Sequence, residues 1–348
     1  MKTAPEQRPE YPFQPIRSEK GLEAALRIPL EELKRVGAKA DKLYRKAKPI
    51  DKGDGTFRQP FDALPELKRI QIRIKNNLLT RVVFPPYLTG SLKGRDYRVN
   101  ARFHTGAAVI VCEDIANFFP NASAQIVLKI WSKLFGFSAD ISELLTALTT
   151  KDGALPQGAV TSSYLANLVL FSSEPKLQAS LANRSIRYSR YVDDITLSST
   201  TRLSKEELTW CISKIYGMLA KHGFHAKRRK HEILRNNAQM FTTKLLVNKR
   251  PALQPKERAA IRSAVYQLEK QVAAGTDLDG LRGKLNSIRG RVEKLKLFHE
   301  REALALKKRL AAALAQSQTT HSGTPKIWEA ASSPVLSSED GHDDSPPW

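Results

Sequence analysis

Two adjacent aspartates, Asp193 and Asp194, stand between two segments of strand-like sequence. Aromatic and β-branched residues, typical of strands, dominate residues 186–192 before the pair and residues 195–198 after it. Neighbouring side chains on a regular strand point to opposite faces, so both carboxylates can serve one site only at a hairpin turn. Crowded carboxylates repel each other unless a cation neutralises them. The pair is therefore either a solvated turn, the commoner case, or part of a divalent-metal site suited to phosphate chemistry.

The net charge of the chain indicates what kind of partner it binds. The 348 residues carry a formal net charge of +22, and residues 317–348 contribute −4, so the residues before them carry +26. A body this basic favours a polyanionic partner, nucleic acid before an anionic membrane surface.

Other classes of protein are disfavoured. No apolar run approaches the roughly 20 residues of a membrane-spanning helix, and the N-terminus has no apolar signal core. Cys112 and Cys211 are the only cysteines, too few for a disulfide framework or a cysteine zinc site. We therefore expect a cytoplasmic protein with no membrane partner.

Hydrophobic periodicity gives the order of the elements. A continuous apolar run at residues 107–112 predicts a buried strand that ends at Glu113 and Asp114. A Gly-rich turn between two short strands is predicted at 52–58, a turn at 155–158 and a short strand at 243–247. The helical patterns cover residues 21–45, 64–83, 124–135, 141–149, 164–171, 205–221 and 256–315.

Three motifs in this order resemble the catalytic motifs of a reverse transcriptase. The first is the strand ending in Asp114, the second is Leu155-Pro156-Gln157-Gly158, and the third is Tyr191-Val192-Asp193-Asp194. The resemblance implies an α+β, right-hand polymerase fold with fingers, an antiparallel palm sheet with helices, and a helical thumb. The expected divisions are a loose N-terminal arm (1–20), N-terminal helices and fingers (21–106), the palm (107–240, with a finger insertion at about 124–160), the thumb (241–316) and a disordered acidic tail (317–348).

The resemblance also implies a reaction. Nucleotide addition needs an activated primer hydroxyl and a neutralised phosphate, which two Mg²⁺ ions can supply. By resemblance, Asp114 and Asp193 bridge the metals, while Asp194 and the backbone carbonyl of Ile115 assist. Lys230 matches a lysine that can protonate the leaving pyrophosphate, although Lys227, Arg228 and Arg229 beside it are alternatives.

Other residues match the site for the incoming dNTP. Phe119 corresponds to the aromatic that excludes a 2′-hydroxyl, with a core aromatic as the alternative reading, and Gln157 to a residue that contacts the nucleotide. Lys52 and Arg58 match the fingers hairpin that grips the triphosphate, although Lys48 could replace Lys52. Tyr191 borders the same site.

A five-residue element narrows the family to bacterial retron enzymes. Asn100-Ala101-Arg102-Phe103-His104 resembles their Asn-Ala-x-x-His element, and residues 90–95 are also similar to theirs. Their Val-Thr-Gly signature is only partly present, because Thr243 is retained while Lys244 replaces the glycine. We take Lys244 to rule out a glycine-only backbone conformation. Alternatively, Asn100 is an ordinary loop residue and His104 is a polar residue whose hydrogen bonds are made within the protein.

The retron resemblance implies a set of partners. Such an enzyme binds its own structured noncoding RNA and starts from an RNA 2′-hydroxyl. It copies part of the RNA into multicopy single-stranded DNA, commonly in anti-phage defence with a separate effector protein. Asn100, His104 and Lys244 would contact this RNA. Basic residues of the thumb suit its phosphates, with a solvated helix face as the alternative: Arg282, Lys284, Arg289 and Arg291.

Two other functions stay open. A different bacterial defence or abortive-infection reverse transcriptase, with another priming mode, is consistent with the departure at Lys244. A catalytically idle RNA-binding protein on the same scaffold is the other, and the intact Asp114, Asp193 and Asp194 argue against it.

Overall fold

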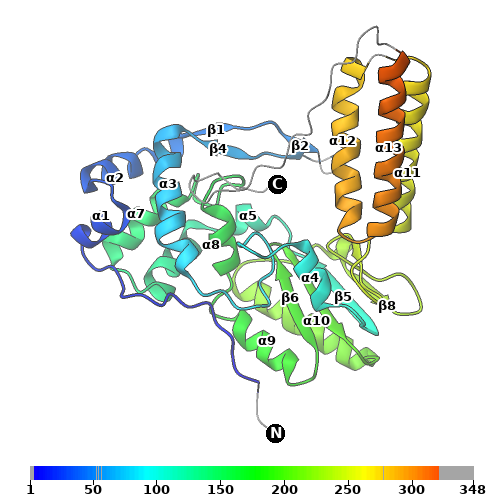
Figure 1. The fold of residues 1–348 in the computed structure, drawn as a ribbon. Coiled ribbons are helices and arrows are strands. Elements are labelled where there is room, and N and C mark those ends of the chain that lie inside the picture. Colours follow the sequence, from blue (N-terminus) through cyan, green and yellow to red (C-terminus); the bar gives the residue numbers. More distant parts are fainter. Residues whose placement is uncertain (1–3, 52, 54, 56, 277, 321–348) are drawn as a thin grey trace. The chain divides into compact units, whose positions relative to one another are not determined.

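The computed structural model describes residues 4–51, 53, 55, 57–276 and 278–320. They form two compact units, a sheet unit before Lys244 and a helical unit from Lys244 onward (Figure 1). Lys52 and residues 321–348, most of the expected acidic tail, lie outside the described residues. None of the helices in the described part is long and apolar enough to cross a membrane.

The N-terminal segment is held against the sheet unit rather than loose. Glu10 exchanges two backbone hydrogen bonds with Val83, and the ring of Tyr11 packs against that of Phe135 in a tilted arrangement, with centroids 4.6 Å apart. The expectation of a loose arm is therefore wrong for these residues, because an aromatic anchor outweighs the Pro-rich and charged composition around it.

The predicted helix over 21–45 is divided. Helix α1 (Glu19–Leu26) ends at Arg27, which is left-handed with φ 53°, and α2 (Leu30–Gly37) begins after Pro29. A short 3₁₀ turn, η1 (Ala40–Lys42), follows. Two hairpins come next, β1 (Tyr44–Lys46) with β4 (Phe61–Ala63) and, between them, β2 (Ile50–Asp51) with β3 (Phe57–Arg58). Helix α3 (Pro65–Asn77) and η2 (Leu79–Arg81) complete this region.

One four-stranded antiparallel sheet organises the unit, in the order β6–β7–β5–β8. Its strands are β5 (Val109–Asp114), β6 (Arg187–Tyr191), β7 (Asp194–Ser199) and β8 (Glu232–Arg235). The predicted buried strand is present as β5, and the predicted hairpin is present as β6 and β7. Asp114 lies directly opposite Asp194 in the register of β5 and β7.

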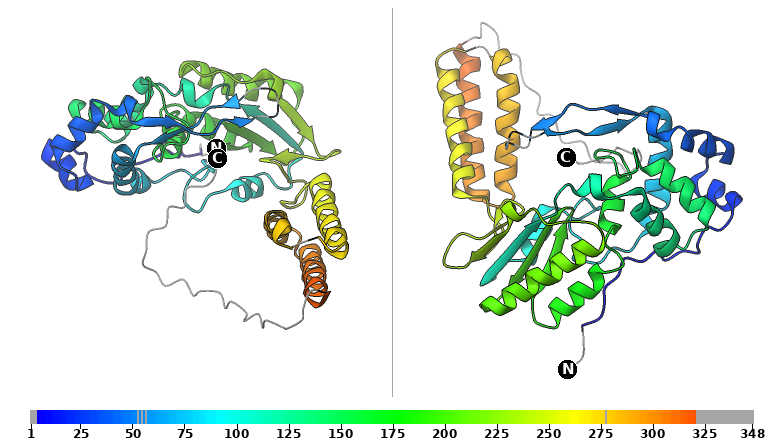
Figure 2. Two further views of the ribbon diagram at one scale, coloured as in Figure 1. Left: turned by 90° about the horizontal axis from the view of Figure 1, so that it is seen from above. Right: turned by 180° about the vertical axis from the view of Figure 1, so that it is seen from behind.

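The two faces of this sheet differ in chemistry. Tyr188 and Glu113 point toward α9 (Glu174–Ala182) and α10 (Lys205–Lys221), which cover one face (Figures 1 and 2). The opposite face carries the hydroxyls of Ser189, Thr196 and Ser198 and is covered by α4 (Tyr97–Phe103). Alternation along each strand places Asp114 and Asp194 on this second, polar face.

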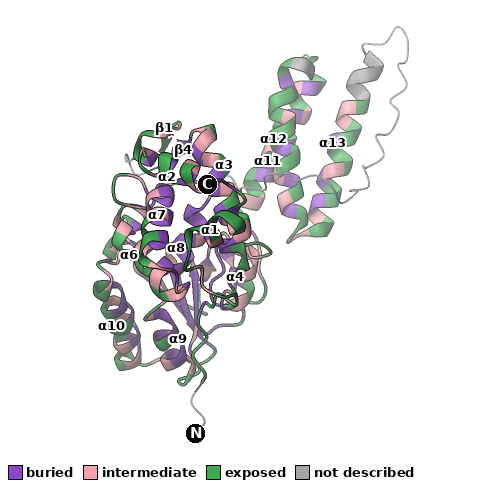
Figure 3. Ribbon diagram, turned by 90° about the vertical axis from the view of Figure 1, so that its left-hand side faces the viewer, coloured by how far each residue is buried: buried purple, intermediate pink, exposed green. Residues whose placement is uncertain are grey.

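The remaining helices include α6 and α7, which pack against each other, and α7 also packs against α2 and α3. Figure 3 shows buried residues on the strands and on the inner sides of the helices, with exposed residues outside. The predicted helix over 124–135 is α6 followed by one π-helical segment, η3, whose Trp131 is fully buried. The elements are α5 (Phe118–Asn121), α6 (Ala124–Lys129), η3 (Ile130–Leu134), α7 (Ala139–Thr149), α8 (Ser162–Leu168), η4 (Arg228–Lys230) and β9 (Phe241–Thr242).

The helical unit contains three long helices. After β10 (Leu245–Leu246) come α11 (Pro255–Ala273), α12 (Leu278–Lys296) and α13 (Glu300–Thr320). Leucine, valine and isoleucine side chains are buried between them, and ion pairs such as Arg309–Glu269 at 2.6 Å join their outer edges. The helical pattern predicted over 256–315, punctuated by glycines, is thus observed as these separate helices, with α11 ending at Ala273 and α12 at Lys296.

Candidate active site

The hairpin between β6 and β7 brings three carboxylates to one end of the polar face. Tyr191 pairs with Asp194, so Val192 and Asp193 form a two-residue turn. The amide of Ile115 donates a 2.9 Å hydrogen bond to the carbonyl of Asp193, which ties the end of β5 to this turn. Residues opposite each other in an antiparallel pair have Cβ atoms about 5 Å apart, so Asp114 and Asp194 are neighbours.

The carboxylates are electrostatically crowded. Burial, followed by the charges of Asp193 and Asp114, raises the pKa of Asp194 to about 7. Burial and the charge of Asp114 also raise the pKa of Asp193. Lys230 and Arg58 act in the opposite direction on both groups. Such a set of anions attracts a cation or a proton.

Lys230 contacts this set directly. Its Nζ lies 2.5 Å from Oδ2 of Asp114, and the amide of Lys227 donates to the carbonyl of Asp114 at 2.7 Å. Partial burial alone would lower the pKa of Lys230, but the hydrogen bond to Asp114 raises it. Among the candidate basic residues, Lys230 has a side chain that bonds a carboxylate of the site.

The donor set fits a hard divalent cation, although it is not a complete cage. Within the described residues, no group of three or more His, Cys, Asp and Glu side chains is arranged to hold a metal ion. Asp114 is engaged with Lys230, and Mg²⁺ usually takes only one or two carboxylates together with substrate phosphates and water. Crowded carboxylates, among them Asp193 and Asp194 with raised pKa values, fit such a role.

The residues expected to hold the nucleotide lie on several elements of the sheet unit. Phe119, on α5, is half-buried, and its ring packs 5.6 Å from that of Phe118. The carbonyl of Gln157 accepts a 2.7 Å hydrogen bond from Phe61 of β4, so this turn is joined to the hairpin region that carries Arg58. Tyr191 is half-buried and Arg58 is exposed.

Asn100 and His104 are fully buried, which corrects the expectation that they contact RNA. Oδ1 of Asn100 accepts from Ser189 and from Thr89, both at 2.7 Å, and its Nδ2 donates to Thr242 at 3.0 Å. His104 lies 2.6 Å from Ser189 and 2.8 Å from Ser198. Residues 100–104 therefore join α4 to β6 and β7, which form the catalytic hairpin, through internal hydrogen bonds.

Lys244 also differs from expectation. Its φ of 66° and that of Thr243, 48°, are left-handed, so the lysine adopts the conformation that glycine would favour. The replacement does not exclude that backbone shape; it adds strain to it. Lys244 itself is exposed. In α12, Arg282, Lys284 and Arg289 are exposed and Arg291 is half-buried.

The roles of Arg190 and Glu174, which lie behind the hairpin, were missed in the sequence analysis. Arg190 is fully buried and forms an ion pair with Glu174, with Nε 2.6 Å from Oε1. A Cβ added to Gly90 would come within 2.7 Å of the amide of Val192. One signal in the sequence could have revealed this ion pair. Arg190 lies within a strand next to the Asp193–Asp194 motif, and an arginine buried in a strand needs a partner for its charge.

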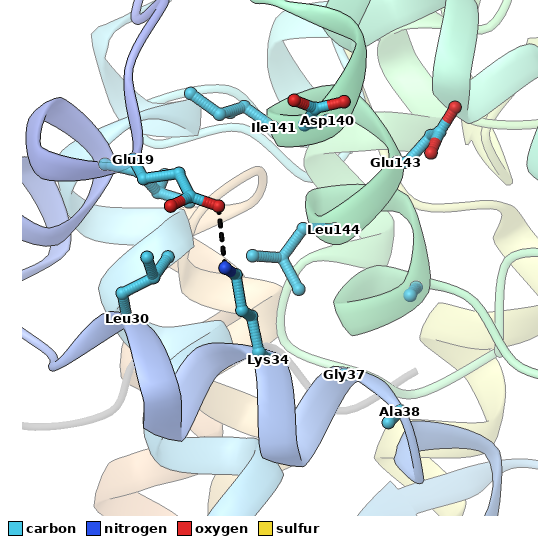
Figure 4. A pocket seen from close by; sticks show the side chains of 11 residues that line it. Glu19, Leu30, Lys34, Gly37, Ala38, Asp140, Ile141, Glu143 and Leu144 are labelled. Carbon is cyan, nitrogen blue, oxygen red and sulfur yellow. Dashed lines mark ion pairs between the residues drawn. The ribbon is translucent and has the colours of Figure 1, made fainter.

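One cavity lies away from the predicted site residues. A space of about 360 Å³ is lined by residues of α1, α2 and α7, with Leu144 on one side and the Glu19–Lys34 ion pair, 2.7 Å long, across it (Figure 4). The site residues predicted from the sequence are not among those that line it.

The fold and the site define a class of protein. An antiparallel sheet presents three carboxylates at a hairpin, with a lysine on one of them, which is the arrangement of a nucleotidyl-transferring polymerase. Comparison with known proteins identifies the family. Residues 50–258 match the family model described as reverse transcriptase (RNA-dependent DNA polymerase).

Curated relatives are retron enzymes. The chain is 35% identical over 270 residues to the Retron Se72 reverse transcriptase of Salmonella heidelberg, covering 76% of this chain and 71% of the relative. It is 32% identical over 304 residues to the Retron Ec48 reverse transcriptase of Escherichia coli, covering 82% and 74%. The chain therefore belongs to the reverse transcriptase family as a retron-type RNA-directed DNA polymerase, which confirms the resemblance seen in its sequence.

Proposed function

We propose that this polymerase copies part of a structured noncoding RNA into multicopy single-stranded DNA, primed from a 2′-hydroxyl of the same RNA. The register that sets Asp114 opposite Asp194 beside the turn of Asp193 is the observation that supports the chemistry. The similarity to retron enzymes supports the choice of template and product. A role in anti-phage defence with a separate effector protein extends the same proposal.

The parts of such an enzyme can be assigned to elements of the fold as part of this proposal. The sheet with α9 and α10 would be the palm, the hairpins β1–β4 with the N-terminal helices the fingers, and α11–α13 the thumb. In the thumb, the exposed cations Arg282, Lys284 and Arg289, with the half-buried Arg291, would contact the phosphates of the RNA–DNA duplex.

Asp114, Asp193 and Asp194, with the carbonyl of Ile115, would hold two Mg²⁺ ions. When bound there, Mg²⁺ supplies charge neutralisation at the phosphate and a more acidic primer hydroxyl. Lys230, already within hydrogen-bond reach of Asp114, would donate a proton to the leaving pyrophosphate.

The selection of dNTPs falls to the residues around the carboxylates. Arg58 would bind the triphosphate, Gln157 and Tyr191 the base and sugar, and the ring of Phe119 would exclude a 2′-hydroxyl. Support for Arg58 comes from its effect on the pKa values of Asp193 and Asp194, which requires that it lie near them.

Asp193→Asn tests the proposal, with the exposed Asp152→Asn as a matched control. On a primed RNA template, Asp193→Asn should reduce extension by at least about 10³-fold while RNA affinity stays within about twofold, because the loss concerns the reaction and not template binding. Residual extension within tenfold of the wild type would reject the metal-binding role.

The alternative is a defence reverse transcriptase with a different priming mode. The incomplete match at Thr243 and Lys244 is what favours it. DNA linked covalently to protein, in place of a branched RNA–DNA molecule, would select this alternative.

A further inference from the structure

Arg190 connects the catalytic hairpin to two helices behind it. Nη1 donates to the carbonyl of Val192 at 3.0 Å and to that of Ala166 at 3.2 Å. Nη2 donates to the carbonyl of Asn167 at 2.8 Å and to Oε2 of Glu174 at 2.9 Å, while Nε donates to Oε1 of Glu174. Every guanidinium nitrogen thus has a partner, and one of these partners belongs to the turn that carries Asp193.

The turn itself needs such support. Val192 has φ 59°, a left-handed conformation that is strained for a β-branched residue. Gly90 lies against it, and the side chain of Asn167 donates to the carbonyl of Gly90 at 2.9 Å. Strained conformations persist only where the surroundings hold them, and here the restraints come from Arg190 on one side and Gly90 on the other.

We propose that Arg190 and Glu174 are positioning residues that hold the Val192–Asp193 turn in its strained conformation and so set the carboxylate of Asp193 for polymerisation. The inference rests on the proposed function of Asp193. Arg190 points to the face of the sheet covered by α9, opposite to the face of Asp114 and Asp194, so it acts through the turn and not on the substrate.

The chemistry of arginine explains why this residue is suited to the role. A planar guanidinium has five N–H donors in a fixed fork, and a lysine in its place could satisfy Glu174 but not the separate carbonyls as well. Glu174 neutralises the charge, since both side chains are almost completely buried.

Arg190→Lys is the first test, and Arg187→Lys on the same strand is its control. Arg187 donates to the carbonyls of Phe103 and Thr105 and not to the turn. In primer extension, Arg190→Lys should lower kcat by about 10- to 100-fold and change KM for dNTP by less than about threefold, because small displacements of a reacting group cost this much. The control should stay within about threefold of the wild type.

Two measurements distinguish a positioning role of Arg190 from a general loss of stability in the variant. Hydrogen–deuterium exchange across residues 191–194, measured without substrates, should rise at least about fivefold in Arg190→Lys and not in Arg187→Lys. Adding Val192→Gly to Arg190→Lys should recover at least about threefold in kcat, because glycine adopts positive φ without strain. Should Arg190→Lys fail to fold, Glu174→Gln carries the same measurements.

The possible outcomes are distinct. Any of three results for Arg190→Lys would overturn the proposal: a kcat equal to that of the control, unchanged hydrogen–deuterium exchange at the turn, or no recovery of kcat when Val192→Gly is added. If Asp193→Asn is inactive while Arg190→Lys is normal, the positioning role fails and the proposed function stands. If the wild-type protein extends no primer, the proposed function fails, and the exchange measurement still decides whether Arg190 holds the turn.

Discussion

His104 is fully buried, and its neutral state makes a measurable contribution to stability. Ser189 must donate its hydroxyl proton to Asn100, whose Oδ1 only accepts. Nε2 of His104 therefore carries a proton and donates to Ser189, while Nδ1 accepts from Ser198. A second proton, on Nδ1, would find no acceptor unless the Ser198 hydroxyl reoriented. Burial, with a smaller effect of Arg187, accordingly lowers the pKa of His104 to about 3.

The sign of the effect follows from proton linkage. In the unfolded chain the histidine binds a proton near its ordinary pKa of 6.5, and in the folded protein it does so only near 3. Between these values the unfolded state binds more protons, so the free energy of unfolding decreases as the pH falls from 6.5 toward 3. At pH 5 the loss from this one group is about 2 kcal/mol relative to pH 8, at 1.36 kcal/mol per pKa unit. Because pH 5 lies well above 3, this figure depends mainly on the unfolded-state pKa.

His104→Gln removes this titration and tests the magnitude. The variant should be less stable than the wild type at pH 8 by about 2 kcal/mol or more, because buried hydrogen bonds are lost. By urea unfolding, that difference should shrink by about 2 kcal/mol at pH 5. A difference for His104→Gln that is the same at both pH values would refute burial of a neutral imidazole, as would a loss of activity confined to the cognate RNA.

Three further substitutions test other parts of the site. Phe119→Ala should raise rNTP incorporation relative to dNTP by about tenfold or more in single-nucleotide assays, and unchanged discrimination would remove Phe119 from the sugar pocket. Lys230→Ala should slow incorporation by about 10²-fold, whereas the exposed Arg228→Ala should lose less than about threefold; equal losses would assign the effect to charge alone. Lys244→Gly should stabilise the helical unit by up to about 1 kcal/mol in urea unfolding, since it relieves a left-handed lysine, and destabilisation of that size would contradict the backbone argument.

Local patterns predicted the elements whose signals are complete within a short stretch of sequence. The helix predicted at 205–221 is observed as Lys205–Lys221, because Ser204 and Glu207 form a capping box at its start. The apolar run at 107–112 is observed as part of β5, whose core position follows from its composition. By contrast, α4 spans only seven residues, too few for a periodic signal, and its helical state depends on the Asp96 cap and on contacts with β6 and β9.

Motif order located the carboxylates, but burial of polar residues could not be read from the chain. Asn100 and His104 resemble surface-recognition residues in sequence, and their hydrogen bonds to Ser189, Ser198 and Thr242 exist only once distant strands have met. Arg190 is similar, since its partner Glu174 belongs to another element. Polar interior networks depend on tertiary contacts, which local periodicity does not encode.

The nucleic acid that copurifies with the protein reports whether this enzyme makes the proposed branched RNA–DNA product. Cells that express the wild type or Asp193→Asn, each with the flanking noncoding DNA, would supply the two samples for sequencing and debranching. The wild type should carry a structured RNA joined through a 2′-hydroxyl to single-stranded DNA, and Asp193→Asn should carry the RNA alone. Equal amounts of the same DNA in both samples, or DNA attached to the protein, would contradict the account.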